Sequence, residues 1–264
     1  MKKYLVLGNP IDHSLSPKLH NYWFSNYNVD ATYDKIKLEK DQIEKLIQDI
    51  KEKKINGINV TVPYKKTIIP FLDTLSIESK KTESVNTVYL DDNKVIGHNT
   101  DIFGFEQSIK NINFDLKNKK ILILGSGGVV SSLIFCLYKM NVAEIIVTNR
   151  TKNKADQLKE IFNDLTIVEW GEVPHFDMII NATSLGLNTE DDLNLDLSKV
   201  GKNKLFYDVI YNPIQTNFLK LGQELGNLTI NGKMMFIYQA AAAFKIWHGI
   251  YPTIDKNLIN LLNK

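Results

Sequence analysis

Residues 120–139 read KILILGSGGVVSSLIFCLYK, and this stretch contains the pattern on which the fold prediction rests. Its first part, Lys120–Leu124, is a compact apolar segment typical of a buried strand. A glycine-rich turn follows, and Val129–Lys139 then has the apolar composition of a packed helix. A strand, a glycine-rich turn and a helix in this order let backbone N–H groups and the helix N-terminus approach a pyrophosphate.

The turn itself is GSGG, residues 125–128. Gly125 permits a tight turn, Gly127 permits close approach of a ligand to the backbone, and Gly128 adds clearance. The third position of the dinucleotide fingerprint holds Val130, where Gly or Ala is usual. A turn of this kind is weak evidence alone, so the identity of the ligand depends on the strand that follows.

The next predicted strand, Ala143–Thr148, ends at residues that indicate which dinucleotide is bound. An NAD site would place Asp or Glu about 20 residues after the turn, to bind the ribose 2′-hydroxyl. Asn149 and Arg150 occupy that place, and Lys154 follows one turn later. Two cations and a hydroxyl suit a 2′-phosphate, because guanidinium pairs well with phosphate oxygens. We therefore favour NADP over the alternative that Arg150 and Lys154 lie on an ordinary helix surface.

Strand and helix patterns alternate along the whole chain, which is typical of an α/β protein with parallel sheets. The other predicted strands are 3–7, 32–36, 57–62, 166–169, 178–181 and 205–208, with a hairpin formed by 85–90 and 94–98. The other predicted helices are 17–26 with Ser16 as N-cap, 40–53, a short helix after Pro63, 151–162, 234–247 and 254–262. Residues 188–204 are polar and rich in turn residues, so we expect a loop there.

Charge and composition exclude several classes of function. The 264 residues include 32 Lys and Arg against 30 Asp and Glu, a net charge of +2 without long runs of one sign, which disfavours a nucleic-acid partner. No apolar run approaches the roughly 18 residues of a membrane helix, and the N-terminal apolar stretch is too short for a signal peptide, so we expect a cytoplasmic protein. The single Cys136 and five scattered histidines indicate no metal site.

Ser14 and Ser16 precede a predicted helix, directly before Pro17. Their hydroxyls could bind a carboxylate at the helix N-terminus. The alternative is a plain N-cap followed by Pro at the first helical position. The sequence here leaves both open.

Polar side chains also gather around a second predicted strand end. Strand alternation puts Asn59 and Thr61 on one face, and Lys65 follows just past the strand. Asn86 begins a later strand, and Asp101 is either a helix N-cap or first-turn acid, or a proton-handling partner for Lys65. Hydride transfer to a ketone leaves charge on the oxygen, and a Lys–Asp pair beside that oxygen can supply the proton.

These motifs, in this order, resemble those of the shikimate dehydrogenase family over nearly the whole chain. The segments similar to the family's substrate-site motifs are SLSP (14–17), NVTVPYK (59–65), NT (86–87) and NTD (99–101). Those similar to its NADP motifs are GSGG (125–128) and NRT (149–151). NATS (181–184), YNP (211–213), GKMM (232–235) and QAA (239–241) complete the set.

The resemblance implies a reversible, NADPH-dependent reduction of 3-dehydroshikimate to shikimate, in the pathway to chorismate and the aromatic amino acids. It implies that Lys65 and Asp101 are the catalytic pair. The residues implied for substrate binding are Ser14, Ser16, Asn59, Thr61, Lys65, Asn86, Asp101, Tyr211 and Gln239. With Lys154, the residues expected to bind NADP are Gly125, Ser126, Gly127, Gly128, Val129, Asn149, Arg150, Thr151, Thr183, Ser184, Gly232 and Met235.

The resemblance also implies two α/β domains. The substrate-binding domain is expected to be discontinuous, residues 1–101 plus 237–264, so that the C-terminal helices complete the N-terminal half. Residues 102–236 are expected to form a Rossmann-like NADP-binding domain. The expected partner is a small molecule, and the resemblance permits a monomer or a homodimer.

Two alternatives stay open. A relative of broader specificity would also use quinate, whose extra hydroxyl the pocket must accommodate. Ser16 favours shikimate, and Arg150 with Lys154 argues against the NAD-dependent quinate enzymes. A non-catalytic dinucleotide-binding regulator on the same scaffold would need a pocket but no proton relay, so the presence of both Lys65 and Asp101 argues against it.

Overall fold

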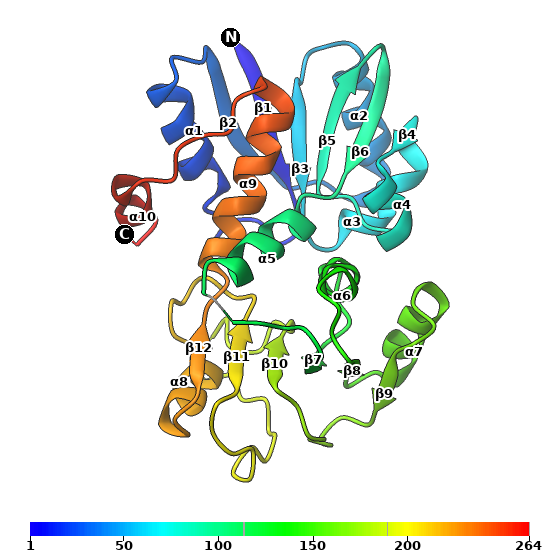
Figure 1. The fold of residues 1–264 in the computed structure, drawn as a ribbon. Coiled ribbons are helices and arrows are strands. Elements are labelled where there is room, and N and C mark those ends of the chain that lie inside the picture. Colours follow the sequence, from blue (N-terminus) through cyan, green and yellow to red (C-terminus); the bar gives the residue numbers. More distant parts are fainter. Residues whose placement is uncertain (113, 189, 264) are drawn as a thin grey trace. The chain divides into compact units, whose positions relative to one another are not determined.

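The chain divides into two compact units, each built around its own sheet. The computed structural model describes residues 1–112, 114–188 and 190–263. Unit 1 comprises residues 1–104 and 237–264, and unit 2 comprises residues 105–236. The divisions fall inside two helices, α5 (Asp101–Lys110) and α9 (Lys233–His248) (Figure 1).

Unit 1 contains a mixed sheet in the order β2-β1-β3-β5-β6-β4. Its strands are β1 (Lys2–Leu7), β2 (Ala31–Ile36), β3 (Gly57–Val60), β4 (Thr74–Leu75), β5 (Thr87–Asp91) and β6 (Lys94–His98). β1 pairs in parallel with β2 and β3, whereas β5 pairs antiparallel with β3 and with β6. The predicted hairpin is therefore confirmed. The carboxyl ends of β1 and β3 meet at one edge, from which several predicted site residues follow.

A group of short helical elements accompanies the sheet of unit 1. It contains α2 (Ile43–Lys51) after a 3₁₀ turn at Lys40–Gln42, α3 (Tyr64–Thr67), the 3₁₀ turn Ile69–Phe71 and α4 (Ile77–Thr82). The four apolar residues of α2 that the sequence placed on one face are all buried in the core of the sheet: Ile43, Leu46, Ile47 and Ile50. The α-helix is shorter than the predicted range 40–53. Residues 40–42 form a separate 3₁₀ turn, which a capping box between Glu39 and Gln42 stabilises.

A cluster of aromatic side chains packs α9 against β1, β2 and α1 (Ser16–Asn26). His20 of α1 stacks on Tyr33 of β2, with ring centroids 4.3 Å apart and planes 2° apart. Tyr4 of β1 lies 4.8 Å from Trp247 of α9 between ring centroids. Gly57 is needed here, because a Cβ on it would lie 2.6 Å from Nε1 of Trp247. This packing places the C-terminal helix in unit 1 (Figure 1), where α10 (Lys256–Leu261) follows it.

Unit 2 contains a parallel sheet in the order β12-β11-β10-β7-β8-β9 among its described residues. The strands are β7 (Lys120–Leu124), β8 (Glu144–Thr148), β9 (Thr166–Val168), β10 (Met178–Asn181), β11 (Leu205–Asp208) and β12 (Leu228–Ile230). Counted from β7, this is the order of a doubly wound dinucleotide-binding fold, which reverses between β7 and β10. Ligands bind such sheets outside the carboxyl ends of the strands at that point.

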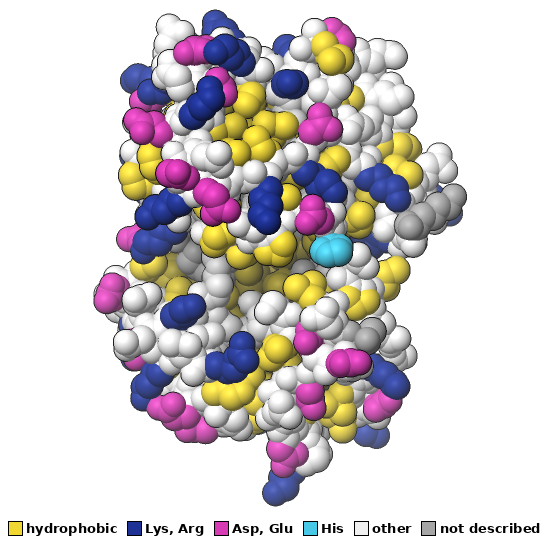
Figure 2. Space-filling view, turned by 180° about the vertical axis from the view of Figure 1, so that it is seen from behind, with side chains coloured by type: hydrophobic (Ala, Val, Ile, Leu, Met, Phe, Trp, Pro, Cys, Tyr) yellow, Lys and Arg dark blue, Asp and Glu magenta, His cyan; other side chains and the backbone are white. Residues whose placement is uncertain are grey.

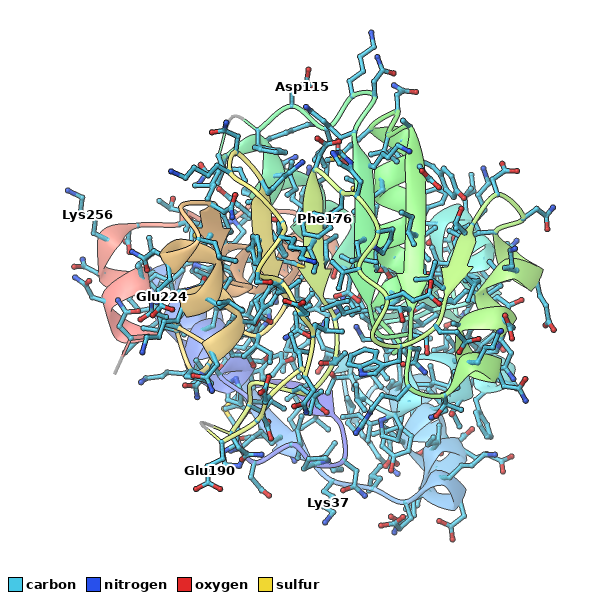
Figure 3. The ribbon with its side chains drawn as sticks, turned by 90° about the horizontal axis from the view of Figure 1, so that it is seen from below. Lys37, Asp115, Phe176, Glu190, Glu224 and Lys256 are labelled. Atoms are coloured by element: carbon cyan, nitrogen blue, oxygen red, sulfur yellow. The ribbon has the colours of Figure 1, made fainter. Side chains whose placement is uncertain are left out.

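The helices of unit 2 include α6 (Val130–Lys139), α7 (Lys152–Ile161) and α8 (Asn217–Glu224). Cys136 is fully buried on α6, and burial raises the pKa of its thiol to about 12, as suits a small apolar residue. In the core, Phe176 lies edge-on to Phe206 with centroids 6.2 Å apart. Figure 3 shows Phe176 inside this unit, whereas Asp115 and Glu224 point outward.

The structure corrects the predicted cap of the first helix. Ser16 is the first residue of α1, and Leu15 occupies the N-cap without a side-chain hydrogen bond. The backbone N–H of Ser16 instead donates to Oγ of Ser14 at 3.3 Å. The prediction that Ser16 is an N-cap was wrong because Ser14 accepts from this N–H through a short local turn.

The predicted loop 188–204 includes Thr189, which lies outside the described residues, and the remainder contains no helix or strand. Among the described residues, no helix is both long and apolar enough to cross a membrane. On the face shown in Figure 2, Lys and Arg side chains are interspersed with Asp and Glu. This mixture agrees with the balanced charge of the sequence.

The aromatic cluster of unit 1 makes its stability sensitive to acid. Burial lowers the pKa of His20 to about 3 and that of His248 to about 4, and neither ring nitrogen of His20 has a partner among the described residues. Unfolded histidine titrates near 6.5, so below that pH the unfolded state binds more protons and the free energy of unfolding falls. For His20 we expect a loss of about 2 kcal/mol between pH 7 and pH 5.

Urea unfolding of the wild-type chain and of His20→Phe at pH 7 and pH 5 measures this effect. The phenyl ring keeps the stack on Tyr33 and removes the titration, so the variant should lose less stability on acidification. His13, which is exposed, replaced in the same way, is the matched control and should keep the wild-type dependence. Equal losses in the wild type and His20→Phe would contradict this account.

Candidate functional site

A buried ion pair lies in unit 1. Nζ of Lys65 in α3 donates to Oδ2 of Asp101, the first residue of α5, at 2.5 Å. The two residues expose only 8% and 5% of their surface. Taking two charges out of water costs several kcal/mol per ion, so such a pair needs good geometry and further hydrogen bonds. The site therefore depends on the groups that hold Asp101.

Asn86 supplies those hydrogen bonds. Its Nδ2 donates to Oδ1 of Asp101 and to Oγ1 of Thr100, both at 2.9 Å, and approaches Oε1 of Gln239 at 3.3 Å. Its Oδ1 accepts from the backbone N–H of Thr100 at 2.7 Å. One amide thus fixes the start of α5 and brings in a residue of α9. Four of the predicted substrate residues meet here.

Asn59 is held by a second set of hydrogen bonds. Its Nδ2 donates to the carbonyl of Asn86 and to Oγ1 of Thr87, both at 3.0 Å. Its Oδ1 accepts from the hydroxyl of Tyr33 at 2.7 Å. Both amide hydrogens are therefore used inside the protein, and only a lone pair on Oδ1 remains for a ligand. Asn59 can accept a hydrogen bond from a ligand hydroxyl.

Three hydroxyls lie around the edge where β1 and β3 end. The backbone N–H of Thr61 donates to the carbonyl of Leu7 at 2.8 Å, which places Thr61 beside the end of β1. Ser14 and Ser16 stand at the N-terminus of α1, where the N-cap residue Leu15 makes no side-chain hydrogen bond. The hydroxyls of these three residues donate to no described residue. Hydroxyl donors and the positive end of a helix dipole together suit a carboxylate.

The glycine-rich turn of unit 2 lies at the point where the strand order reverses. Gly125 has φ +105°, and a Cβ on it would lie 2.9 Å from the carbonyl oxygen of Ala182, just after β10. Gly127 and Gly128 are exposed, and a Cβ on Gly127 would meet only that same oxygen, at 3.9 Å. One side of the turn is therefore packed and the other is open, as a dinucleotide requires.

The helix that follows also fits this ligand. Val129 is the N-cap of α6 and provides no side-chain cap, although the N–H groups of Val130 and Ser132 already donate to the carbonyls of Gly127 and Val129. The positive end of the helix dipole still favours an anion at this N-terminus. Val130 is fully buried, so the residue that departs from the fingerprint packs into the core and not toward the turn. Ser126, between Gly125 and Gly127, is half-buried.

The residues after β8 carry unpaired positive charge. Arg150, Thr151 and Lys154 are exposed, and neither cation forms an ion pair with a described residue. Lys152, which lies between them, instead pairs with Glu169 at 2.5 Å. Nδ2 of Asn149 donates to the carbonyl of Thr151 at 2.8 Å and so shapes the turn. Two free cations beside a dinucleotide turn fit a 2′-phosphate.

The remaining predicted cofactor residues lie on loops at the same sheet edge or at the start of α9. Thr183 is half-buried and Ser184 exposed, after β10. Gly232 packs against the backbone of Val209 so closely that a Cβ would overlap it, and Met235 is buried. Tyr211, predicted to bind substrate, belongs to unit 2 and stacks on Phe236 with centroids 4.4 Å apart.

Two residues of these networks were missed by sequence reasoning. Tyr33 orients Asn59, and Asp208 is a fully buried carboxylate at the end of β11. The sequence did contain a signal for Asp208, because Asn181 and Asp208 are each the polar last residue of an apolar strand, at the carboxyl edge where ligands bind.

Among the described residues, no group of three or more His, Cys, Asp or Glu side chains could hold a metal ion.

Two protein-family models match the chain. The model described as the shikimate dehydrogenase substrate binding domain matches residues 6–88. The model described as shikimate / quinate 5-dehydrogenase matches residues 107–209. The shikimate dehydrogenase (NADP(+)) of Pelagibacter ubique is 56% identical over 262 residues, covering 99% of each chain.

Solved structures agree with this likeness. A shikimate dehydrogenase crystallised with NADP+ has a TM-score of 0.93 and 32% identity, covering 100% of this chain and 95% of that chain. The shikimate 5-dehydrogenase of Thermus thermophilus, crystallised with NADP(H) and shikimate, has a TM-score of 0.88 and 29% identity, covering 96% of this chain and 95% of that chain. The predicted fold class is confirmed, and the chain belongs to the shikimate dehydrogenase family of oxidoreductases.

Proposed function

We propose that the chain catalyses the reversible, NADP-dependent interconversion of shikimate and 3-dehydroshikimate. The observation that carries this proposal is the buried Lys65–Asp101 pair, which Asn86 holds in place. A site that only recognises a ligand needs shape and hydrogen bonds, but no buried acid–base pair. The names of the Pelagibacter ubique relative and of the Thermus thermophilus complex support the same substrate and cofactor.

The two ligands are assigned to different domains. Residues 1–101 with 237–264 form the substrate-binding domain in this proposal, and residues 102–236 form the NADP-binding domain. The division of the chain into two compact units supports this assignment, as does the matched substrate-binding model over residues 6–88. The oligomeric state, monomer or homodimer, stays a prediction.

Proton transfer at the substrate oxygen is the task of the buried pair. When bound, NADPH would supply the hydride for the carbonyl carbon. Lys65 holds the proton that the developing alkoxide oxygen takes at Nζ, and its charge stabilises that oxygen before the proton moves. Asp101 accepts from the same Nζ and keeps the ammonium oriented. In the oxidation direction, the pair takes the hydroxyl proton back.

The rest of the substrate is held by neutral polar groups. We assign the carboxylate to the hydroxyls of Ser14, Ser16 and Thr61, because their hydrogens are not used by described residues and the N-terminus of α1 lies beside the two serines. Ring hydroxyls can donate to Oδ1 of Asn59, whose hydrogens are already used. Asn86, Gln239 and Tyr211 complete the assigned set. This leaves Lys65 as the cation of the site.

The cofactor is assigned to the exposed turn and the free cations of unit 2. The turn and the first turn of α6 (Ser126, Gly127, Gly128 and Val129) receive the pyrophosphate in this assignment. Arg150 and Lys154 receive the 2′-phosphate, with Asn149 and Thr151 beside them. Thr183, Ser184, Gly232 and Met235 are assigned to the nicotinamide half.

The first test is the initial rate of nicotinamide reduction by purified protein with shikimate and NADP⁺. We expect fast turnover with this pair, and slow turnover in the crossed controls with quinate or NAD⁺. Comparable rates with quinate or NAD⁺ would move the chain to the relatives of broader specificity. No turnover from folded protein in any combination would favour a ligand-binding regulator, which calorimetry with NADPH and shikimate would then examine.

For Lys65→Ala we expect kcat to fall about a hundredfold or more, with KM values changed only modestly, because the proton is transferred in the transition state. The neighbouring Lys66 is the matched control, since it is exposed and pairs with Glu83 at the surface. Lys66→Ala should keep the wild-type kcat. Removing Lys65 leaves Asp101 buried without its cation, so thermal unfolding is measured in parallel. An unchanged kcat in folded Lys65→Ala would remove Lys65 from the mechanism.

Coenzyme preference is expected to depend on Arg150 and Lys154. For Arg150→Ala and Lys154→Ala we expect kcat/KM with NADP⁺ to fall about tenfold each, because a charge-assisted contact to the 2′-phosphate is lost. The rate with NAD⁺ should stay nearly unchanged, since NAD⁺ lacks that phosphate. The measurement is the ratio of kcat/KM for the two coenzymes in each variant.

Lys152→Ala is the matched control for this pair. Lys152 lies on the same helix turn, but its charge is already satisfied by Glu169. Its variant should keep the wild-type coenzyme ratio. If all three variants changed the ratio equally, general surface charge would explain the preference, and the assignment of Arg150 and Lys154 would be wrong.

A further inference from the structure

Asp208 is a buried carboxylate to which the chemistry above gives no task. It ends β11 and has no exposed surface. Its Oδ1 accepts from the backbone N–H of Ile210 at 2.9 Å, and its Oδ2 accepts from the hydroxyl of Thr216 at 2.7 Å. Nδ2 of Asn181, at the end of β10, lies 3.2 Å from both oxygens. All of these donors are neutral.

The donors belong to two loops at the carboxyl edge of the sheet. Asn181 leads into the loop after β10, where its Oδ1 accepts from the backbone N–H of Thr183 at 3.1 Å and from the Thr183 hydroxyl at 2.7 Å. Its Nδ2 also donates to the carbonyl of Leu185 at 2.9 Å. Ile210 and Thr216 belong to the loop after β11, and Thr216 also caps α8.

Both loops reach the predicted cofactor groups. A Cβ on Gly125 would lie 3.1 Å from Cγ2 of Thr183, so the first loop lies against the glycine-rich turn. In the second loop, the carbonyl of Ile210 accepts from the backbone N–H of Gly232 at 2.9 Å. The Asp208 carboxylate is therefore connected to the glycine-rich turn through the first loop and to Gly232 through the second loop.

The carboxylate is costly to keep. Burial raises the pKa of Asp208 to about 6, although the hydrogen bonds from Thr216, Ile210 and Asn181 oppose this rise. A folded-state pKa above the unfolded value means that the folded state binds more protons between about pH 4 and pH 6, so stability falls as pH rises through that window. A residue that opposes folding at neutral pH and holds two ligand-facing loops is a candidate for a functional role.

We propose that Asp208 is a positioning residue of the cofactor site, whose carboxylate fixes the loops after β10 and β11 and thereby the groups that receive NADP. This inference rests on the proposed function. Asp208 touches neither ligand in this account and acts through Asn181, Ile210 and Thr216. An uncharged amide in its place fills the same space but cannot accept from all three donors at once.

The test compares Asp208→Asn with the wild type and with Asp177→Asn. Asp177 is the matched control because it immediately precedes β10, at the opposite edge of the sheet, where it accepts from the backbone N–H of Lys120. The dissociation constant of NADPH, measured by fluorescence, should rise about tenfold in Asp208→Asn, since a charged acceptor is lost. It should be unchanged in Asp177→Asn. The KM for shikimate should rise modestly in Asp208→Asn, because Tyr211 lies in the loop after β11, and should be unchanged in Asp177→Asn.

The pH dependence separates positioning from a general structural role. The wild type loses the charge of Asp208 on acidification, so the variant-to-wild-type ratio of NADPH dissociation constants should be largest near pH 8 and clearly smaller at pH 5.5. The 2′-phosphate also titrates near pH 6, but it affects both proteins equally and cancels in the ratio. The neighbouring Tyr207 and Cys136 stay protonated and neutral in this range, because burial raises both pKa values.

Two further readouts complete the design. Removing the buried charge favours folding and losing an acceptor opposes it, so Asp208→Asn should unfold close to the wild-type temperature at pH 8. Hydrogen exchange of the unliganded variant should speed up in residues 182–187 and 209–216 and stay unchanged in 120–124. This second readout requires no cofactor.

The outcomes are distinct. A tenfold, pH-dependent loss of NADPH affinity at unchanged thermal stability supports the proposal. Unchanged affinity, or an equal loss at both pH values together with a lower unfolding temperature, overturns it. If the wild type itself binds no NADPH, the proposed function fails, and hydrogen exchange then decides whether Asp208 orders the two loops. Unchanged exchange in both loops would overturn that role as well.

Discussion

The buried ion pair between Lys65 and Asp101 is the interaction on which the rest of unit 1 depends. Removing one partner from such a pair typically costs about 3–5 kcal/mol, because the other charge is left in a medium that solvates it poorly. The pair forms only if α3 follows β3 and α5 follows β6 at fixed positions, since its partners are 36 residues apart. Asn86, between them in sequence, links both the carboxylate and the start of α5.

Unit 2 depends on a different constraint, the close approach of backbone segments at one sheet edge. The strands pair in a register that aligns Leu124, Asn181 and Asp208 across β7, β10 and β11. A residue with a side chain at Gly125 would meet the carbonyl of Ala182, so only glycine lets the turn and the next loop share this edge. The same register brings Asn181 and Asp208 together as hydrogen-bond partners.

The predictability of each element follows from its burial. Lys120–Leu124, Met178–Asn181 and Leu205–Asp208 have the predicted bounds, because strands covered on both faces read as continuous apolar runs. α4 and α8 were not predicted. Both are short and contain many polar residues, so their few apolar residues do not establish a helical repeat. Their positions depend on packing against the sheets, which the pattern of a short segment does not reveal.

The predicted site residues show the same division. Lys65, Asn86, Asp101 and Gln239 are brought together in one network, as motifs at strand and helix ends suggested. Sequence spacing did not reveal that both amide hydrogens of Asn59 are used internally, because Tyr33 and Thr87 come from other strands. Hydrogen-bond partners that come from distant segments of the sequence can be identified only in the folded structure.

The two buried carboxylates, Asp101 and Asp208, show how environment decides the role of one residue type. Asp101 faces a cation, so its charge is compensated directly, and in the proposed function it orients the ammonium that gives up the proton. Asp208 faces only neutral donors, so burial prevails and raises its pKa to about 6. Its charge is better suited to hold loops in place than to exchange protons with a ligand that it does not touch. In the two proposals, proton transfer and loop positioning are separated because one carboxylate has a lysine as its partner and the other has only amide and hydroxyl donors.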